Sequence, residues 1–218
     1  AAKGLRAVLL DFDLTMTVLP EVPRYRLFPG FGDREPDVGW LRETAFGGAE
    51  RLGLLLEALA ELERRRAELF IVSFASKECI VRALKLVGGL SHFGEEGERI
   101  YGWEELAAGV GGGPLMLRAQ KGDFLAQLKA SRGWRREEVL FLDDQPDNIR
   151  SAQGHCLTFY VRGRGLSVEE LDALRRSGGL ELAGPLAQPR PCEAEEVDSN
   201  ATERGRSGSR SRSRSFDM

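Results

Sequence analysis

The sequence predicts an α/β fold built on a parallel β-sheet, and three observations carry this prediction. Short apolar runs alternate with helical patterns along most of the chain, which is typical of α/β proteins. The apolar runs are continuous and do not alternate with polar residues, as expected for strands covered on both faces. Acidic and hydroxyl side chains follow several of these runs, at the positions where parallel sheets bind their ligands.

Five apolar runs are predicted to be the strands of this sheet. The first, Leu5–Leu10, ends at an acidic residue, and the second follows a predicted helix and ends at a serine. The fourth run ends at an acidic pair, and the fifth ends before a glycine-containing turn. The strands expected after the first lie at Leu69–Val72, Ile100–Gly102, Val139–Leu142 and Cys156–Val161.

Four segments between or after these runs are predicted to be helices. Leucines recur at helical spacing through Glu50–Arg66, and Lys77–Leu90 contains two glycines near its end. Lys121–Ser131 also has a helical pattern. A last helix is expected from Ser167, because two glutamates occupy its first turn.

Composition and length are those of an ordinary globular protein. The chain has 218 residues, of which 42% are hydrophobic and 30% charged, and its formal net charge is −3. This length is sufficient to bury a core without metal or disulfide crosslinks. No run approaches the roughly 20 apolar residues of a membrane span, so no membrane association is expected.

The cysteines and histidines exclude several classes of site. Cys79, Cys156 and Cys192 are far apart and form no C-x-x-C pair, which predicts free thiols in a reducing compartment such as the cytoplasm. The only two histidines, His92 and His155, make a zinc site improbable. No G-x-S-x-G motif is present to support a serine hydrolase.

The end of the chain differs from the rest in composition. The domain is expected to span residues 4–182, and residues 183–218 form an acidic and then Arg/Ser-rich tail. This tail has too few apolar residues to offset its ordering entropy, so we expect it to be disordered. From residue 189 onward it holds six acidic residues and six arginines. Nucleic-acid binding and a nuclear location are alternatives that rest on this tail alone.

Polar residues gather where the predicted strands end. Asp11, Asp13 and Thr15 follow the first strand, Ser73 follows the second, and Lys121 begins a helix. Asp143 and Asp144 follow the strand at Val139–Leu142. So many carboxylates at one edge of a sheet are costly unless a cation or an anionic ligand organises them. Hard oxygen ligands suit Mg²⁺, so the pattern favours magnesium-dependent phosphoryl transfer.

These residues resemble the motifs of the haloacid dehalogenase superfamily. Its first motif, D-x-D-x-T, corresponds to Asp11–Thr15, and its apolar strand ending in Ser corresponds to Phe70–Ser73. Its helix-start lysine corresponds to Lys121, although Arg118 and Lys129 lie nearby. Its acidic pair corresponds to Asp143 and Asp144, followed by Asn148. The resemblance implies a Rossmann-like three-layer α/β sandwich with a central parallel sheet.

The resemblance also implies a role for each residue. Asp11 would be the nucleophile and Asp13 the general acid/base, with Lys121 steadying Asp11 and the phosphate. Ser73, Thr15 and Lys121 would bind the phosphoryl group, and Thr15 would support the turn toward the flap. Mg²⁺ would be held by Asp11, the Asp13 backbone carbonyl and Asp144, with Asp143 binding it directly or through water.

The segments between the motifs indicate the size of the cap. About 35 residues, rich in Pro, Gly and aromatic residues, separate Thr15 from the first long helix, which is too few for a large helical cap. We therefore expect an open site with a minimal cap or flap over 18–46. This form is similar to the small-cap magnesium-dependent phosphatase subgroup, which implies a phosphorylated small molecule or a phosphoprotein as substrate.

Two alternatives remain at this point. The chain is a catalytically weak binding or regulatory protein that keeps the fold, or an RNA-associated factor that acts through its Arg/Ser tail. The second acid, Asp13, favours phosphate chemistry over dehalogenation, because true dehalogenases of the superfamily lack it.

Overall fold

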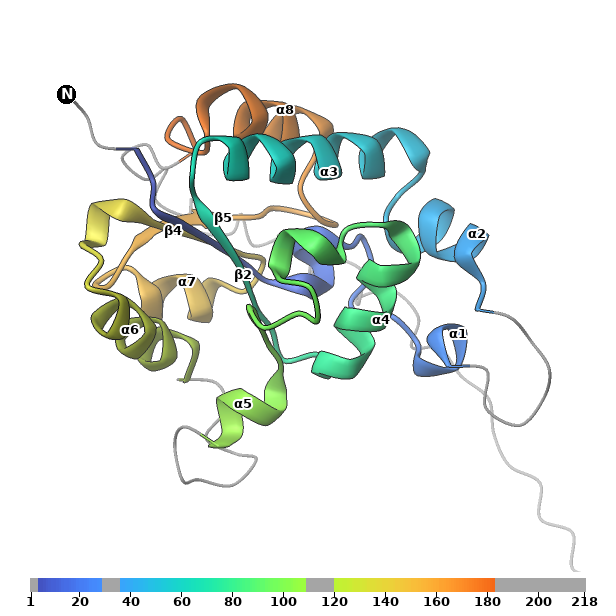
Figure 1. Cartoon of the computed structure of the whole chain (residues 1–218), viewed down its shortest axis with the longest axis horizontal. Helices are drawn as coiled ribbons and strands as arrows, with labels where there is room; N and C mark the ends of the chain where they lie inside the picture. Colours follow the sequence, from blue (N-terminus) through green and yellow to red (C-terminus); the bar gives the residue numbers. More distant parts are fainter. Residues whose placement is uncertain (1–3, 29–35, 109–119, 183–218) are drawn as a thin grey trace, which may run out of the picture. The chain divides into compact units, whose positions relative to one another are not determined.

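Five parallel strands lie at the centre of the computed structural model, in the order β3-β2-β1-β4-β5 (Figure 1). The structure describes residues 4–28, 36–108 and 120–182. The central strand β1 pairs with β2 and β4, and Leu10 is in register with Ile71 and Leu142. The side chains that follow these three strands therefore emerge at one edge of the sheet. The strands are β1 Ala7–Leu10, β2 Glu68–Val72, β3 Ile100–Tyr101, β4 Val139–Asp143 and β5 Leu157–Tyr160.

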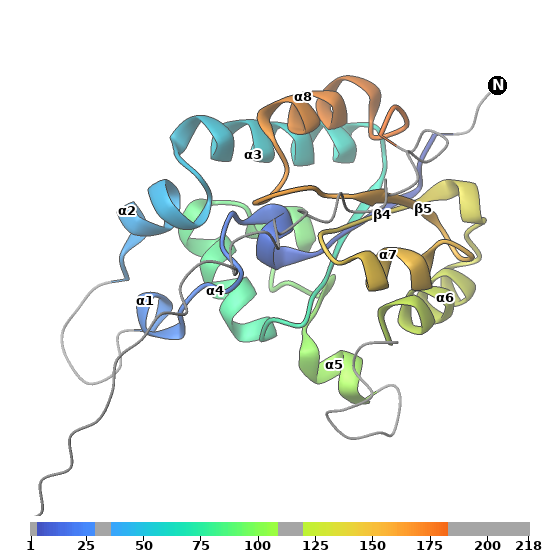
Figure 2. The same cartoon turned by 180° about the vertical axis from the view of Figure 1, so that it is seen from behind.

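Helices cover both faces of the sheet, so the fold has three layers (Figures 1 and 2). Helices α3 and α8 pack together over one face, and α6 and α7 pack together over the other. The long helices are α3 Ala49–Arg64, α4 Lys77–Val87, α6 Gln120–Arg132 and α8 Val168–Ser177. The shorter ones are α1 Arg24–Leu27, α2 Val38–Trp40, α5 Trp103–Ala108 and α7 Pro146–Ala152.

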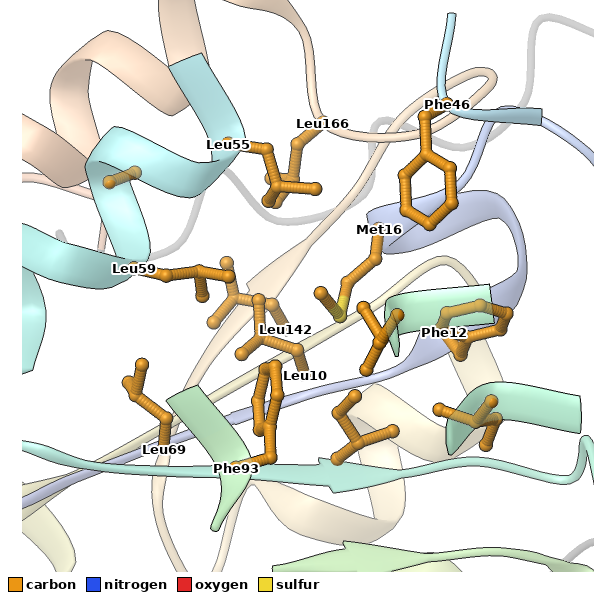
Figure 3. Close-up of a cluster of buried hydrophobic side chains, with 14 of the residues drawn as sticks. Leu10, Phe12, Met16, Phe46, Leu55, Leu59, Leu69, Phe93, Leu142 and Leu166 are labelled. Atoms are coloured by element: carbon orange, nitrogen blue, oxygen red, sulfur yellow. The ribbon is translucent and has the colours of Figure 1, made fainter. Parts of the chain in front are cut away.

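The alternation of side chains along β1 divides the core in two. Val8 and Leu10 belong to a cluster with leucines of α3 and α8, whereas Ala7 and Leu9 belong to a cluster with residues of α6 and α7. Figure 3 shows the first cluster, in which Met16 extends from the chain just after β1 toward Leu10 and Leu142, and Phe12 lies at its side. Burial on both faces explains why the strands are apolar throughout.

The predicted fold class is confirmed, and so is each predicted strand and long helix, with ends shifted by a few residues. Helix α7 was not expected as a separate element, because Asp143–Asn148 also fits a turn. Its start is explained by Pro146, which occupies the first helical position, where a missing N–H costs nothing. Helices α1, α2 and α5 were also not expected.

The expected flap lies between β1 and α3, and its described parts pack against the core. Leu27 of α1, Leu41 and Phe46 are buried in the cluster that includes Met16. The described residues between 36 and 48 form short helices. Those between 74 and 108 form helices and the short strand β3, which joins the sheet. Both segments are of the size expected for a minimal cap. The predicted tail, residues 183–218, and the Val110–Pro114 loop lie outside the described residues.

Two further expectations concern the cysteine thiols and membrane-spanning helices. Cys79 and Cys156 are both free thiols, as predicted, while Cys192 lies outside the described residues. Within the described ranges, every helix is too short or too polar to cross a lipid bilayer.

Candidate active site

Asp11 stands at the carboxyl end of the central strand and is almost fully buried. Its backbone N–H donates to the carbonyl of Leu142 at 2.9 Å, which continues the pairing of β1 with β4 by one residue. Only 5% of the surface of Asp11 is exposed to solvent. Its Oδ1 lies 2.9 Å from Nζ of Lys121, so a buried carboxylate and a buried ammonium face each other.

Lys121 joins two carboxylates that come from neighbouring strands. Its Nζ lies 2.9 Å from Asp11 Oδ1 and donates to Asp143 Oδ2 at 2.7 Å. Burial disfavours the charged ammonium, but the charges of Asp11 and Asp143 outweigh this effect and raise the pKa of Lys121. The rings of Phe74 and Phe141 lie 4.9 and 6.0 Å from Nζ and shield this cation. Lys121, and not Lys129, is the lysine that the fold brings to Asp11; Arg118 lies outside the described residues.

Both carboxylate oxygens of Asp143 accept hydrogen bonds from neighbouring residues. Asn148 Nδ2 donates to both of its oxygens at 3.0 Å, and the backbone N–H of Gln145 donates to Oδ1 at 2.7 Å. Burial raises the pKa of Asp143, whereas Lys121 and Asn148 favour its ionised form. With these donors and the Lys121 ammonium, both oxygens of Asp143 are occupied. Asn148 comes from α7, one turn after the acidic pair, which explains the D-D-x-x-x-N spacing.

Asp13 lies in a tight turn, η1 (Phe12–Met16), directly after Asp11. Leu14 in this turn has φ +52°, a left-handed conformation that is uncommon for a leucine and is characteristic of constrained functional loops. Oδ1 of Asp13 is buried and has no hydrogen-bond partner among the described residues. Burial raises the pKa of Asp13 to about 8, and the nearby charges of Asp11 and Glu21 add to this increase. At neutral pH and without a bound cation, Asp13 is therefore largely protonated.

The two hydroxyl residues predicted to bind phosphate are also buried near the ends of β1 and β2. Ser73 follows β2, where its backbone N–H donates to Tyr101 and its Oγ accepts from the N–H of Ala75 at 3.2 Å. Thr15 is fully buried in η1, and its Oγ1 has no partner among the described residues. The structure therefore supplies both hydroxyls without committing their protons elsewhere.

Three carboxylates gather closely enough to hold a metal ion. One oxygen each from Asp11, Asp143 and Asp144 lies within 4.8 Å of the others. When ionised, the three carboxylates carry three negative charges, and the Lys121 ammonium offsets one of them. A divalent cation would neutralise the remaining two. Asp144 is half-buried; burial and the charge of Asp11 raise its pKa to about 6. This all-oxygen donor set fits a hard cation such as Mg²⁺.

Arg51, which sequence reasoning did not select, holds the turn that carries Asp13 and Thr15. Arg51 lies in α3, and its guanidinium is buried. The guanidinium donates to the carbonyls of Met16, Phe46 and Leu166 at 2.8–2.9 Å. It also donates to the carbonyl of Thr15 at 3.3 Å. Burial lowers the pKa of Arg51 to about 10, so the group stays charged at neutral pH. Gly165 must be a glycine here, because a Cβ would lie 2.6 Å from the guanidinium.

A cavity of about 450 Å³ opens beside Asp13. Its apolar lining includes Phe12, Val22 and Phe74, and its polar lining includes Glu21 and Arg24 from the flap segment. This volume is in the range of small-molecule sites. None of these five lining residues was selected from the sequence, because the path of the flap over the sheet edge depends on tertiary packing.

The chain was compared with known proteins. It matches no protein-family model, and no curated protein matches its sequence. Solved structures resemble it at low sequence identity. A haloacid dehalogenase-superfamily hydrolase from Ehrlichia chaffeensis is 16% identical, with a TM-score of 0.48, and the match covers 84% of this chain and 99% of that one.

Two other solved structures are phosphatases of 3-deoxy-D-manno-octulosonate 8-phosphate. The Moraxella catarrhalis protein, in complex with a magnesium ion, a phosphate ion and a KDO molecule, is 13% identical over 81% of this chain and 90% of its own, with a TM-score of 0.47. The cobalt-bound Haemophilus influenzae protein is 11% identical over 72% and 68%, with a TM-score of 0.44.

Proposed function

We propose that the chain is a magnesium-dependent phosphomonoester hydrolase of the haloacid dehalogenase type. The observation that carries the proposal is the pair formed by Asp11, held against Lys121, and Asp13, whose raised pKa keeps it protonated near neutral pH. A nucleophilic carboxylate beside a carboxyl that can donate a proton is the combination that this hydrolysis needs.

In the first half of the proposed reaction, Asp11 attacks the phosphorus atom. Its Oδ1 faces the Lys121 ammonium, which leaves Oδ2 as the attacking oxygen. As the bond from phosphorus to the leaving oxygen breaks, the Asp13 carboxyl donates its proton to that oxygen. The products are the free alcohol and an aspartyl phosphate on Asp11.

In the second half, a water molecule releases the phosphate. The Asp13 carboxylate takes a proton from the water as the water oxygen attacks phosphorus, and the bond to Asp11 Oδ2 breaks. Inorganic phosphate leaves, and both aspartates return to their starting states. The hydroxyls of Ser73 and Thr15 and the Lys121 ammonium are proposed to hold the phosphoryl oxygens.

Mg²⁺ is the proposed cofactor, held by Asp11, the Asp13 backbone carbonyl and Asp144. When bound, it supplies positive charge that offsets the phosphate and the carboxylates. Asp144 is the better direct ligand of the acidic pair, because Gln145 occupies only its Oδ2, whereas both oxygens of Asp143 already accept hydrogen bonds. Asp143 then acts by orienting Lys121 and Asn148.

The substrate class is a phosphorylated small molecule or an accessible phosphoprotein side chain. The cavity beside Asp13, with a volume of about 450 Å³, supports the small molecule. A role of the tail in nucleic-acid binding has no support from the described residues, because the Arg/Ser-rich segment lies outside them.

The decisive experiment measures phosphate release from an aryl phosphate by wild type and Asp11→Asn. We expect the wild type to be active with Mg²⁺ and inactive with excess chelator, and Asp11→Asn to be inactive in both. The matched control is Asp123→Asn, an exposed aspartate in α6, which should keep wild-type activity. Wild-type turnover by Asp11→Asn would exclude the aspartyl-phosphate mechanism.

Trapping with beryllofluoride distinguishes the enzyme from a regulatory protein. Beryllofluoride with Mg²⁺ should form a mimic of the acyl phosphate on Asp11, and the mimic should be absent in Asp11→Asn. Trapping without turnover on a broad substrate panel would favour the catalytically weak alternative instead.

A further inference from the structure

The cavity beside Asp13 is the space into which a leaving group must extend. Asp13 lines it, and in the proposed mechanism Asp13 protonates the leaving oxygen. The remaining walls come from the flap segment after η1 and from the residues after β2, including Phe74 and Ser76. The chemistry of these walls therefore determines which leaving groups are accepted.

Glu21 is the uncompensated charge of this cavity. It lines the cavity beside Asp13 and also an adjoining open hollow formed with Pro23, Tyr25 and Phe28. Among the described residues, Glu21 makes no ion pair and no side-chain hydrogen bond. Glu21 and Asp13 line the same cavity, so the Glu21 carboxylate faces the space that the leaving group occupies in the proposed mechanism.

Among the described residues, Arg24 is the one cationic side chain that lines the cavity, and it is paired with Glu78. Arg24 Nη2 lies 2.7 Å from Glu78 Oε2, and its guanidinium stacks 4.8 Å from the centre of the Phe28 ring. Arg24 is thus paired with Glu78 and not with Glu21. The Lys121 ammonium is buried between Asp11 and Asp143 and serves the phosphate end alone.

We propose that Glu21 is a specificity-determining residue, which favours cationic or neutral leaving groups and rejects those with a second negative charge. This inference rests on the proposed function and narrows its substrate class to phosphomonoesters of small hydroxyl- or ammonium-bearing alcohols. A second anion in the cavity would face the Glu21 carboxylate, which has no counter-ion among the described residues, and like charges repel. An ammonium group would be attracted, and a hydroxyl would donate a hydrogen bond.

Three substrates with a two-carbon leaving group test this charge selectivity. Phosphoethanolamine, 2-hydroxyethyl phosphate and 2-phosphoglycolate differ in their terminal group, which is an ammonium, a hydroxyl and a carboxylate. We expect wild-type kcat/KM to be at least about tenfold lower for the carboxylate than for the ammonium substrate. In Glu21→Gln the preference for the ammonium over the carboxylate substrate should become much smaller, and in Glu21→Lys it should become smaller still or invert.

Comparing ratios of substrates separates selectivity from other effects of the substitution. Removing the Glu21 charge also changes the pKa of Asp13, but that change acts on the leaving oxygen of every substrate, whereas the charge preference acts only on the terminal group. Glu50→Gln is the matched control, because Glu50 is exposed at the start of α3 and does not line the cavity. Glu21 is exposed, so both of its variants should fold, and equal melting temperatures would show this.

The outcomes distinguish this inference from the proposed function. If the wild type hydrolyses the substrates and the ratio is the same in Glu21→Gln, Glu21→Lys and Glu50→Gln, Glu21 does not select the leaving group and the inference is wrong. If neither these substrates nor an aryl phosphate is hydrolysed in the presence of Mg²⁺, the proposed function is wrong and the inference fails with it. A ratio that shifts only in the Glu21 variants supports both.

Discussion

Gly122 of α6 lies so close to Ser151 of α7 that a Cβ at position 122 would stand 2.5 Å from the Ser151 carbonyl oxygen. This close approach sets the separation of the two helices that supply Lys121 and Asn148. Both side chains bind Asp143, so the helix contact fixes the geometry of the buried charges around it. Gly122 thus determines the position of the neighbouring lysine through the backbone.

Substituting Gly122 with alanine should therefore impair activity more than a typical helix substitution does. The added methyl group must push α6 away from α7, which costs about 1–3 kcal/mol in the free energy of unfolding. It should also move Lys121 from Asp11 and lower kcat by tenfold or more. Urea unfolding and phosphate release measure the two effects.

Gly53→Ala provides the control for this substitution. Gly53 lies within α3, and a Cβ there would have no neighbour within 4 Å. Alanine should stabilise the protein by about 0.5–1 kcal/mol and leave kcat unchanged. Equal behaviour of Gly122→Ala and Gly53→Ala would contradict the role of the helix contact.

Asn148 is expected to act by holding Asp143. Asn148→Ala removes both hydrogen bonds to a buried carboxylate, which should cost about 2 kcal/mol in stability. The Mg²⁺ concentration for half-maximal activity should rise, because Asp143 and the cation cluster lose their orientation. A magnesium titration of activity measures this shift, and an unchanged half-maximal concentration would show that Asn148 does not support the metal site.

The sequence predicted the sheet edge well because that edge is specified locally. An apolar run followed by Asp11 or Asp143 determines both a buried strand and the position of its polar end. Arg51 and Glu21 were not predicted, because their roles depend on contacts that are distant in the chain. Arg51 binds a carbonyl 115 residues away, at Leu166, and Glu21 gains its role only from the path of the flap beside Asp13.

Replacing Arg51 should destabilise the turn that carries Asp13 and Thr15. Arg51→Met keeps the aliphatic part of the side chain but leaves buried carbonyls of the turn and of Leu166 without donors, which should cost about 3 kcal/mol or more. Arg51→Lys should recover part of this loss. Arg64→Met on the same helix removes only an exposed pair with Glu61 and should cost less than about 1 kcal/mol.

The free energy of unfolding of the metal-free protein should decrease as pH rises. In the folded state, the pKa of Asp13 is raised to about 8 and that of Asp144 to about 6, both above the ordinary value of 3.8. The folded protein therefore keeps protons that the unfolded chain releases above pH 3.8, so stability is greatest at low pH for these two groups. The contribution of Asp144 is lost by about pH 6, and that of Asp13 by about pH 8.

Asp13→Asn tests the part of this pH range between 6 and 8. In the variant, the free energy of unfolding should decrease less between pH 6 and 8 than in the wild type, because no carboxyl at position 13 has to ionise. Mg²⁺ should reduce the decrease in the wild type, since a bound cation stabilises the ionised carboxylates. Urea unfolding at pH 5, 7 and 9, with chelator or with Mg²⁺, tests both statements. A wild-type profile that matches Asp13→Asn in chelator would show that Asp13 is ionised in the folded protein at neutral pH, and its assignment as the proton donor would then fail.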